Sequence, residues 1–443
     1  MDKNINSHLV AVIGAGPAGL YASQELAANG VQVVLFNRDI KPGGLAEYGI
    51  NPDKLKMKQG LRNQFRQILT CDQVTYYGNV VIGKNADFSL DELRALGFQA
   101  ILVTTGAQGT KWLGLPGEQY SCVYHAKELV YHYNNLPPFS QQAFCIGRRV
   151  AVVGMGNVMT DVVSYLISQQ VEEVITFARR GPAEVKFGKK ELDGIKASLD
   201  VAALDAEIER VAPIMVAVGE DPAEPRAMMH SIIGDAPSNG SKTRLKMHFL
   251  ASPTQIIGDE YGRVTGLEIE ENSLVCQNGE VRAVGLGLRR IIPIDTVIFA
   301  IGDQVDNELG LPITGNEYAK NPAPQFPLDG VSYESYDPAG KVNLENVFVA
   351  GWSRKASTGM VGIARRDGMS GARVVLKYLA DLPGSDHAAL RKLDRRLIQL
   401  KKPVVTWADI EHLIAVEKQR ADQLGLEDFK FASNHEMLVA MDL

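Results

Sequence analysis

The stretch HLVAVIGAGPAGLYASQELAANGVQVVLFNR, residues 8–38, decides the fold. The apolar run Leu9–Ile13 predicts a buried strand, and a helical pattern follows the glycine turn as far as Asn29. A second apolar run, Val31–Phe36, predicts another strand. A strand, a tight turn, a helix and a second strand form the unit that begins a Rossmann-like parallel sheet.

The turn in this stretch carries three glycines, Gly14, Gly16 and Gly19. Gly14 permits the sharp turn, Gly16 lets the backbone approach a pyrophosphate, and Gly19 lets the helix pack closely on the strand. N–H groups at the start of the helix then face the anion. The alternative is an ordinary strand-to-helix turn, but the complete flanking pattern favours nucleotide binding.

A second copy of the pattern is RRVAVVGMGNVMTDVVSYLISQQVEEVITFARRG, residues 148–181. It again predicts a strand, a glycine turn with Gly154 and Gly156, a helix and a strand. Two such units in one chain indicate two bound dinucleotides. We therefore expect an α/β protein with two dinucleotide-binding Rossmann-like domains.

The residues that end the second strand of each unit indicate which dinucleotide binds there. In the second unit Arg179 and Arg180 occupy this place, and guanidinium groups suit a 2'-phosphate, which predicts NADP. A solvated basic turn is the alternative. The first unit then holds FAD, the other dinucleotide of redox chemistry. Its strand ends in Asn37 instead of a carboxylate, so we expect a weaker and unusual contact to the ribose.

Composition excludes several classes of function. The 443 residues are 45% hydrophobic and carry a net charge of -6, which does not favour nucleic acid or anionic membranes. No apolar run approaches the length of about 20 residues that crosses a bilayer, and no leader peptide is evident. We expect no membrane insertion and a cytoplasmic location.

The four cysteines are far apart and show no metal-ligand spacing, so we expect buried free thiols and no metal site. Without a cysteine pair, a flavin could not pass its electrons to an internal disulfide, which leaves an external acceptor. Further along the chain, residues 80–82 are a strand candidate, and residues 246–269 and 281–292 indicate antiparallel strands.

Seven motifs are spread over the whole chain: GAGPAGLYAS, PGGLAEYGINPD, YYGNVVIG, GMGNVMTDV, ARRGPAEVKFGKKEL, VFVAGWSRKASTGMVGIARRDG and VTWADIEHLIAVEKQR. In these motifs and in their order, the chain resembles the adrenodoxin-reductase-like ferredoxin-NADP reductases nearly from end to end. The resemblance implies a glutathione-reductase-like architecture of two domains. The FAD domain would comprise residues 1–113 and 336–443, and the NADP domain residues 114–335.

Together, the glycine pattern and the resemblance select the site residues. Residues expected at FAD are Gly14, Gly16, Ala18, Gly19, Asn37, Gly44, Leu45, Ile82, Gly106, Gly351, Trp352, Gly359, Met360 and Val361. Residues expected at NADP are Gly154, Met155, Gly156, Asn157, Val158, Arg179, Arg180, Glu191 and Gly359, where nicotinamide and flavin would meet. Glu191 and Lys54 are the candidates for tuning catalysis.

Four residues depart from the family's pattern. Asn37 replaces a glutamate, and Met159 replaces a small residue, so the NADP turn is expected to be more open or displaced. Glu47 stands where arginine is common, and Lys54 where histidine is frequent. The last two lie in the loop expected near the flavin, so the redox partner or the flavin potential could differ.

The resemblance implies electron transfer between NADPH and a ferredoxin-type iron–sulfur protein, through FAD. An acidic, transient partner would need a basic face. Candidates for it are Lys186, Lys189, Lys190, Arg289, Arg290, Arg354, Lys355, Arg365 and Arg366. The alternatives are a flavoprotein that reduces a small organic substrate or a quinone, the flavin subunit of a larger complex, and a nucleotide-binding sensor without flavin chemistry.

Overall fold

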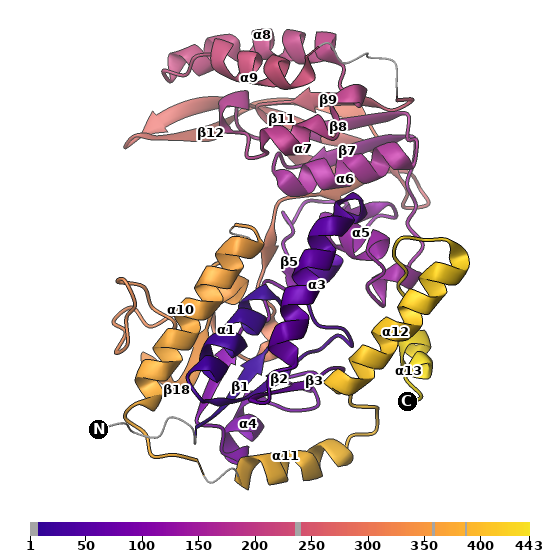
Figure 1. Cartoon of the computed structure of the whole chain (residues 1–443). Helices are drawn as coiled ribbons and strands as arrows, with labels where there is room; N and C mark the ends of the chain where they lie inside the picture. Colours follow the sequence, from indigo (N-terminus) through magenta and orange to yellow (C-terminus); the bar gives the residue numbers. More distant parts are fainter. Residues whose placement is uncertain (1–7, 235–240, 357–358, 386–387) are drawn as a thin grey trace. The chain divides into compact units, whose positions relative to one another are not determined.

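The computed structural model describes residues 8–234, 241–356, 359–385 and 388–443 (Figure 1). The chain divides into two compact units. Unit 1 comprises Met1–Thr110, Tyr131–Gln141 and Gly302–Leu443, and unit 2 comprises Lys111–Val130 and Gln142–Ile301. The first unit therefore takes a short insertion from the middle of the chain.

A six-stranded sheet forms the centre of unit 1, in the order β17-β18-β4-β1-β2-β3. All its strands are parallel except the edge strand β17, which runs antiparallel to β18. The strands are β1 (Leu9–Ile13), β2 (Gln32–Phe36), β3 (Val74–Tyr77), β4 (Ala100–Val103), β17 (Glu334–Asp337) and β18 (Val342–Val349).

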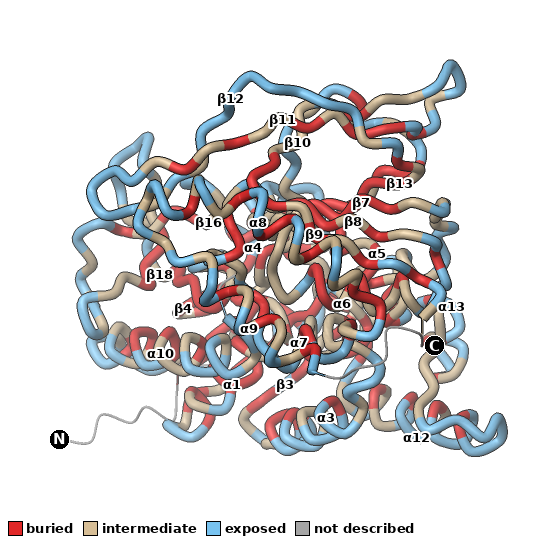
Figure 2. Tube along the Cα trace, turned by 90° about the horizontal axis from the view of Figure 1, so that it is seen from above, coloured by how far each residue is buried: buried red, intermediate tan, exposed pale blue. Residues whose placement is uncertain are grey.

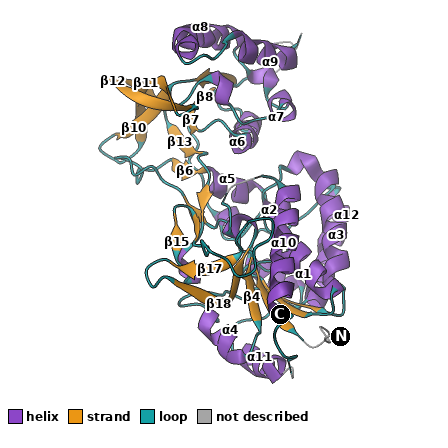
Figure 3. Cartoon of the chain, turned by 90° about the vertical axis from the view of Figure 1, so that its left-hand side faces the viewer, coloured by secondary structure: helices purple, strands orange, loops and turns teal. Residues whose placement is uncertain are grey.

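The central strands β1 and β4 are buried on both faces. Val10 and Val12 face a core shared with α1 (Pro17–Ala28) and α10 (Val361–Leu379), whereas their neighbours along β1 face a second core on the other side. Figure 3 shows the helices that surround the strands. The other helices of this unit are α2 (Leu45–Tyr48), α3 (Leu55–Leu69), α4 (Leu90–Leu96), α11 (Ala388–Ile398), α12 (Trp407–Leu424) and α13 (Asn434–Ala440).

Unit 2 is built on a five-stranded parallel sheet in the order β6-β13-β7-β8-β9. These strands are β6 (Val123–His125), β7 (Arg149–Val153), β8 (Glu173–Phe177), β9 (Arg244–His248) and β13 (Thr296–Phe299). Its helices are α6 (Asn157–Ser168), α7 (Lys189–Asp193), α8 (Val201–Ala217) and α9 (Ala223–Ile233), and α5 (Ala126–Tyr133) runs from this unit into the insertion.

An antiparallel sheet of β10 (Ala251–Gly258), β11 (Val264–Gln277) and β12 (Glu280–Pro293) completes unit 2. Its edge strand β12 is largely exposed, as Figure 2 shows in pale blue, whereas the strands of the parallel sheet are mostly buried. Four short strands are β5 (Gly109–Thr110), β14 (Asp303–Gln304), β15 (Ile313–Thr314) and β16 (Glu317–Tyr318). Single turns of 3-10 helix are η2 (Pro52–Lys54), η3 (Phe139–Gln141), η4 (Pro182–Glu184), η5 (Lys196–Ser198), η6 (Asn307–Leu309) and η7 (Gly351–Ser353).

The structure corrects two secondary-structure expectations. Residues 80–82 are not a strand, because among the described residues the bridge of Ile82 to Phe88 is isolated and belongs to no ladder. Their apolar side chains pack into the core of unit 1 without forming a ladder. The region 246–269 is not wholly antiparallel, since β9 joins the parallel sheet beside β8.

The cysteine prediction is wrong. Cys122 and Cys145 form a disulfide, Cys71 is half-buried and Cys276 is exposed. The two paired cysteines are 23 residues apart, a spacing that matches no local cysteine motif, so only the folded chain brings them together.

The two units also differ from the sequence-based domain limits. Residues 302–335, expected in the NADP domain, lie in unit 1, and so does the insertion Tyr131–Gln141. The physical reason is burial, because Val305, Leu309 and Tyr318 enter the core that covers one face of the six-stranded sheet.

Candidate functional site

The glycine turn after β1 forms the centre of the candidate site in unit 1. Gly14 has a φ of 103°, and a β-carbon there would lie 2.8 Å from the Thr104 carbonyl oxygen. A β-carbon on Gly19 would lie 2.0 Å from the Gly14 oxygen. A β-carbon on Gly16 would meet no protein atom within 4 Å. Two of the glycines are thus required by packing, whereas Gly16 leaves space for a ligand.

The helix that follows offers an anion site. α1 has Gly16 as its N-cap and Pro17 in its first turn, and no side chain among the described residues caps it. Its first N–H groups can therefore bind phosphate oxygens. The loop of Gly43 and Gly44 approaches from the side: Gly43 N donates to Ala15 O at 2.7 Å, and a β-carbon on Gly44 would lie 3.0 Å from the Gly16 Cα.

The side chain of Asn37 is engaged with protein groups. Its Oδ1 accepts from Ala15 N at 3.0 Å, and its Nδ2 donates to the carbonyl oxygens of Asp39 at 2.8 Å and Lys41 at 3.0 Å. The residue is only 7% exposed. Asn37 therefore fixes the glycine turn to the loop that follows β2, and the expected ribose contact stays a prediction.

We expect Asn37→Asp to destabilise the protein by roughly 2–4 kcal/mol. The aspartate keeps an acceptor for Ala15 N but has no amide to donate to Asp39 O and Lys41 O, and it places a carboxylate against two carbonyl oxygens. Urea unfolding of this variant and of the control Asn278→Asp, at an exposed position in the turn between β11 and β12, measures the difference. Equal stability of the two variants would contradict the role assigned to Asn37.

The carboxyl ends of β4 and β18 meet the glycine turn. Ser353 Oγ accepts from Gly106 N at 2.9 Å and lies 3.2 Å from Thr105 Oγ1. A β-carbon on Gly351 would lie 2.6 Å from Ala18 Cβ. Six residues predicted at FAD are therefore brought to one edge of the sheet: Gly14, Gly16, Ala18, Gly19, Gly106 and Gly351.

The turn that carries Trp352 is held by Asp367 from α10. This carboxylate accepts from Gly351 N at 2.6 Å and from Arg354 Nε at 3.1 Å, and Tyr333 Oη donates to it at 3.1 Å. Trp352 itself is half-buried. No sequence pattern indicates Asp367 as a site residue, because it lies 16 positions after Gly351, from whose N–H it accepts a hydrogen bond.

The remaining residues predicted at FAD are more dispersed. Gly359 and Met360 are exposed at the start of α10, Val361 is half-buried, and Ile82 is 8% exposed in the core. Leu45 begins α2, next to Gly44. Lys54 is exposed at the end of η2.

Glu47 belongs to a buried ionic cluster in unit 1, together with Arg62, Lys430, Lys58 and Asn134. Arg62 donates two hydrogen bonds to the Glu47 carboxylate at 2.8 and 2.7 Å, and Lys430 Nζ lies 2.8 Å from it. Burial alone would raise the pKa of Glu47, but Lys430 and Arg62 lower it well below its usual range. The family's arginine is thus replaced by an anion that is fully paired.

Lys58 is the unfavourable member of this cluster. It is 3% exposed and donates to Asn134 Oδ1 at 2.5 Å. Burial and the neighbouring Lys430 ammonium lower the pKa of Lys58 from 10.5 to about 7. The unfolded chain therefore binds this proton more tightly, and stability is lost as the pH falls from 10.5 to about 7.

We expect Lys58→Met to be more stable than the wild type by roughly 2–4 kcal/mol near neutral pH, with the advantage shrinking as the pH rises. The substitution removes a proton that the folded state binds weakly. Urea unfolding over a range of pH values measures it, and Lys56→Met on the exposed face of α3 is the control. An advantage for Lys58→Met that does not change with pH would show that the titration of Lys58 is not its cause.

The glycine turn in unit 2 repeats the geometry of the first. Gly154 has a φ of 125°, and its N donates to Phe177 O at 2.9 Å, as Gly14 N does to Phe36 O at 2.7 Å. A β-carbon on Gly156 would meet no atom within 4 Å. α6 begins at Asn157, and Gly156 is its N-cap without a capping side chain in the described part of the chain.

Met159 takes the place of the third glycine and is fully buried, so the core of unit 2 accommodates its side chain. The expected opening of the turn stays a prediction. Met155 O accepts from Lys186 N at 3.1 Å, which connects the turn to the segment before α7. Asn157 Oδ1 is buried without a hydrogen-bond partner among the described residues, and Val158 is 43% exposed.

Arg179 and Arg180 follow β8, at the same edge as this turn. Arg179 is exposed, and its carbonyl oxygen accepts from Asn272 Nδ2 at 2.9 Å. Arg180 Nε lies 3.6 Å from Glu184 Oε1. Burial raises the pKa of Glu184, although Gly181 N donates to this carboxylate. Of the two arginines, Arg179 is thus the more available to an added anion.

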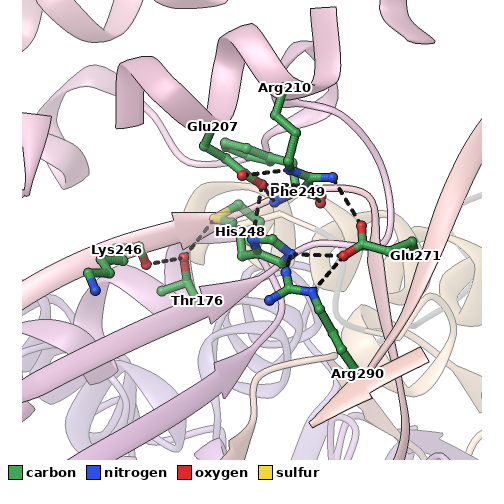
Figure 4. A network of polar contacts seen from close by, with 9 residues as sticks. Thr176, Glu207, Arg210, Lys246, His248, Phe249, Glu271 and Arg290 are labelled. Carbon is green, nitrogen blue, oxygen red and sulfur yellow. Dashed lines mark hydrogen bonds and ion pairs between the residues drawn. The ribbon is translucent and has the colours of Figure 1, made fainter. Parts of the chain in front are cut away.

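A polar network supports this edge of unit 2 from the side of α8 (Figure 4). Glu207 accepts two hydrogen bonds from Arg210, at 2.8 and 2.7 Å, and one from Phe249 N at 2.7 Å. His248 Nδ1 lies 3.1 Å from it. Burial opposes ionisation, yet Arg210 and His248 lower the pKa of Glu207 to about 2. No short motif in the sequence indicates this network.

Glu191 lies in α7 and is half-buried. A β-carbon on Gly188 would lie 2.5 Å from Glu191 Oε2, so the carboxylate folds back over the start of its own helix. Glu191 belongs to unit 2 and Lys54 to unit 1, and their roles in catalysis stay predictions.

Within the described ranges, no group of three or more His, Cys, Asp or Glu residues is arranged to hold a metal ion. In the same part of the chain, no helix is long and apolar enough to cross a membrane.

Known proteins resemble this chain over nearly its whole length. It is 26% identical to NADPH-ferredoxin reductase FprA of Mycobacterium leprae (strain TN), with 97% of this chain and 98% of the relative covered. It is 27% identical to the mitochondrial NADPH:adrenodoxin oxidoreductase of Salvelinus fontinalis, with 98% and 91% covered. These relatives confirm the resemblance to the adrenodoxin-reductase-like proteins.

The fold is confirmed by a solved structure, the His57Gln mutant of FprA from Mycobacterium tuberculosis. It matches with a TM-score of 0.82 at 24% identity, and covers 99% of this chain and 100% of the other. The family model of the pyridine nucleotide-disulphide oxidoreductases matches residues 8–351. The chain belongs to the pyridine nucleotide-disulphide oxidoreductase family.

Proposed function

We propose that this protein is a flavoenzyme that moves electrons between NADPH and a ferredoxin-type iron–sulfur protein. The observation that carries the proposal is the pair of equivalent glycine turns, one in each unit, of which only the second is followed by two arginines. The relatives named NADPH-ferredoxin reductase and NADPH:adrenodoxin oxidoreductase support the same reaction.

FAD is assigned to unit 1. The space at Gly16 and the uncapped start of α1 fit a pyrophosphate, and Gly44 lies against Gly16. The turn of Gly351 and Trp352, held by Asp367, fits the isoalloxazine end of the same cofactor. Bound there, a flavin would accept a hydride and release its electrons singly. The chain's contribution is to position the cofactor.

NADP(H) is assigned to unit 2. Gly156 and the start of α6 fit the pyrophosphate, and Arg179 and Arg180 fit the 2'-phosphate. Asn157 Oδ1, buried and without a partner in the described part of the chain, is an acceptor for a hydrogen bond from the cofactor. Met155, Val158, Glu191 and Gly359 remain further candidates for this site.

The charges of unit 1 favour an acidic, transient partner. Lys355, Arg365 and Arg366 are exposed, whereas Arg354 is bound to Asp367. In unit 2, Arg289 and Arg290 are paired with Glu268 and Glu271, so they contribute less than the exposed residues Lys186, Lys189 and Lys190. Attraction between exposed charges weakens with salt, so the encounter is expected to be salt-dependent.

The decisive assay mixes the purified protein with NADPH, a ferredoxin and cytochrome c as the final acceptor. We expect reduction of cytochrome c that requires ferredoxin and that slows as salt is added. Rapid oxidation of NADPH by a quinone or another small molecule, with no effect of ferredoxin, would reject the partner and favour the alternative function. A protein that binds nucleotide but shows no flavin absorption would favour the sensor.

Glu47 no longer supports the small-molecule alternative, because its carboxylate is buried and paired with Arg62 and Lys430. Lys54 is exposed and is the remaining departure in that loop. The cytoplasmic location stays a prediction from the sequence, although the Cys122–Cys145 disulfide differs from the unpaired thiols that a reducing cytoplasm favours.

A further inference from the structure

The disulfide between Cys122 and Cys145 lies at the base of the insertion. The chain leaves unit 2 after Val130, contributes Tyr131–Gln141 to unit 1, and returns to unit 2 at Gln142. Cys122 comes before this insertion and Cys145 after it, and both belong to unit 2. The covalent bond therefore joins the outgoing and returning segments of the chain.

The two cysteine residues differ in exposure and in backbone conformation. Cys145 is an exposed residue, whereas Cys122 is 5% exposed and has a φ of 70°, in the left-handed region that non-glycine residues rarely adopt. A thiolate from outside would reach Cys145 first. Cys122 would then be the leaving group.

The backbone at both cysteines is held independently of the disulfide. Val297 N donates to Cys122 O at 3.0 Å, and Cys145 N donates to Tyr124 Oη at 2.8 Å. Opening the disulfide would leave these bonds to β6 and β13 in place. The bond can thus be reduced without unfolding the sheet of unit 2.

The insertion Tyr131–Gln141 packs against the loop assigned to FAD in unit 1. Tyr131 and Leu136 form a buried cluster with Tyr48, and Lys58 Nζ donates to Asn134 Oδ1 at 2.5 Å. Tyr48 ends α2, which begins at Leu45. A change in the conformational mobility of the insertion would therefore alter the packing next to the predicted FAD residues Gly44 and Leu45.

We propose that Cys122–Cys145 is a thiol–disulfide exchange site that a dithiol reduces, and that its reduction loosens the Tyr131–Gln141 segment. One thiolate of the dithiol bonds to Cys145 Sγ as the Cys122–Cys145 bond breaks, and Cys122 leaves as a thiolate that takes up a proton. The second thiol then displaces Cys145. The dithiol is oxidised to a disulfide, and the protein gains two electrons and two protons.

Alkylation tests the site itself. The purified protein is incubated with dithiothreitol, with NADPH alone or with neither, then trapped with iodoacetamide in denaturant, so that burial does not hide a thiol, and mapped by mass spectrometry. We expect Cys122 and Cys145 to be labelled only after dithiothreitol, whereas the exposed Cys276 is labelled in every sample. Labelling of both without reductant, or after NADPH alone, would overturn the proposal.

Limited proteolysis with chymotrypsin tests whether reduction loosens the insertion, since the insertion contains the aromatic cleavage sites Tyr131, Tyr133 and Phe139. We expect cleavage there to be at least ~10-fold faster in reduced protein and in Cys122→Ser/Cys145→Ser, because the closed loop restricts the opened state. Cys276→Ser is the matched control and should cleave at the wild-type rate. Equal rates in oxidised and reduced protein would overturn the loosening.

Both readouts are independent of the proposed function, because neither needs flavin or ferredoxin. A third measurement, retention of bound flavin during gel filtration, rests on the assignment of FAD to unit 1. We expect the reduced protein to retain less flavin than the oxidised protein. Unchanged retention together with faster cleavage would reject the link to the FAD loop and leave the exchange site itself standing.

Discussion

Replacing Arg179 and Arg180 together by alanine is expected to raise the KM for NADPH by roughly 100-fold or more, since each charged hydrogen bond to a phosphate contributes about 1.5–3 kcal/mol. The KM for NADH should change by less than about threefold, because NADH has no 2'-phosphate for the guanidinium groups to bind. Steady-state kinetics with both nucleotides and a ferricyanide acceptor measures the ratio.

The single variants Arg179→Ala and Arg180→Ala separate the contributions of the two arginines to NADPH binding. Arg179 is exposed and its backbone is fixed by Asn272, whereas Arg180 is close to Glu184. Arg179→Ala should therefore account for most of the loss. Arg282→Ala is a suitable control, because this arginine is exposed on β12 and paired with Glu280. If the double variant loses NADPH and NADH activity to the same extent, the 2'-phosphate assignment is wrong.

The sequence predicted the strands of both Rossmann-like units well, and the physical reason is visible in the sheets. Strands that are buried on both faces must be continuously apolar, so Leu9–Ile13 stands out between polar residues and a glycine turn. The same logic misled at residues 80–82. Their apolar side chains fill the core from a loop, which a pattern of hydrophobicity does not distinguish from a strand.

The residues of the candidate site could be predicted where they all lie within one short segment of the sequence. The glycines follow a fixed local spacing, so Gly14 and Gly154 were found from the sequence, although the Thr104 and Ala300 backbones that they must approach lie far along the chain. Contacts between distant parts of the chain were not predictable. Lys430 reaches Glu47 across 383 positions, and Asn272 fixes Arg179 across 93. These pairings depend on how the chain packs, and no local pattern encodes them.

The glycines also allow the binding and packing roles to be separated experimentally. We expect Gly16→Ala to weaken flavin binding by roughly 100-fold, because a β-carbon would occupy the space into which the pyrophosphate fits. The flavin-free variant should unfold within about 0.5 kcal/mol of the flavin-free wild type, since the added methyl group meets no protein atom and the φ of −79° suits alanine. Flavin content and urea unfolding measure the two effects.

Two further variants make this test specific. Gly19→Ala should lose both flavin and stability, because its β-carbon would lie 2.0 Å from the Gly14 oxygen and 2.6 Å from Thr104 Oγ1. Gly156→Ala, at the equivalent place in unit 2, should keep flavin and lose NADPH binding. If Gly16→Ala instead retained flavin while Gly156→Ala lost it, the two cofactors would have to exchange units. If neither variant affected flavin, the edge of the sheet at Gly14 and Gly351 would not be its site.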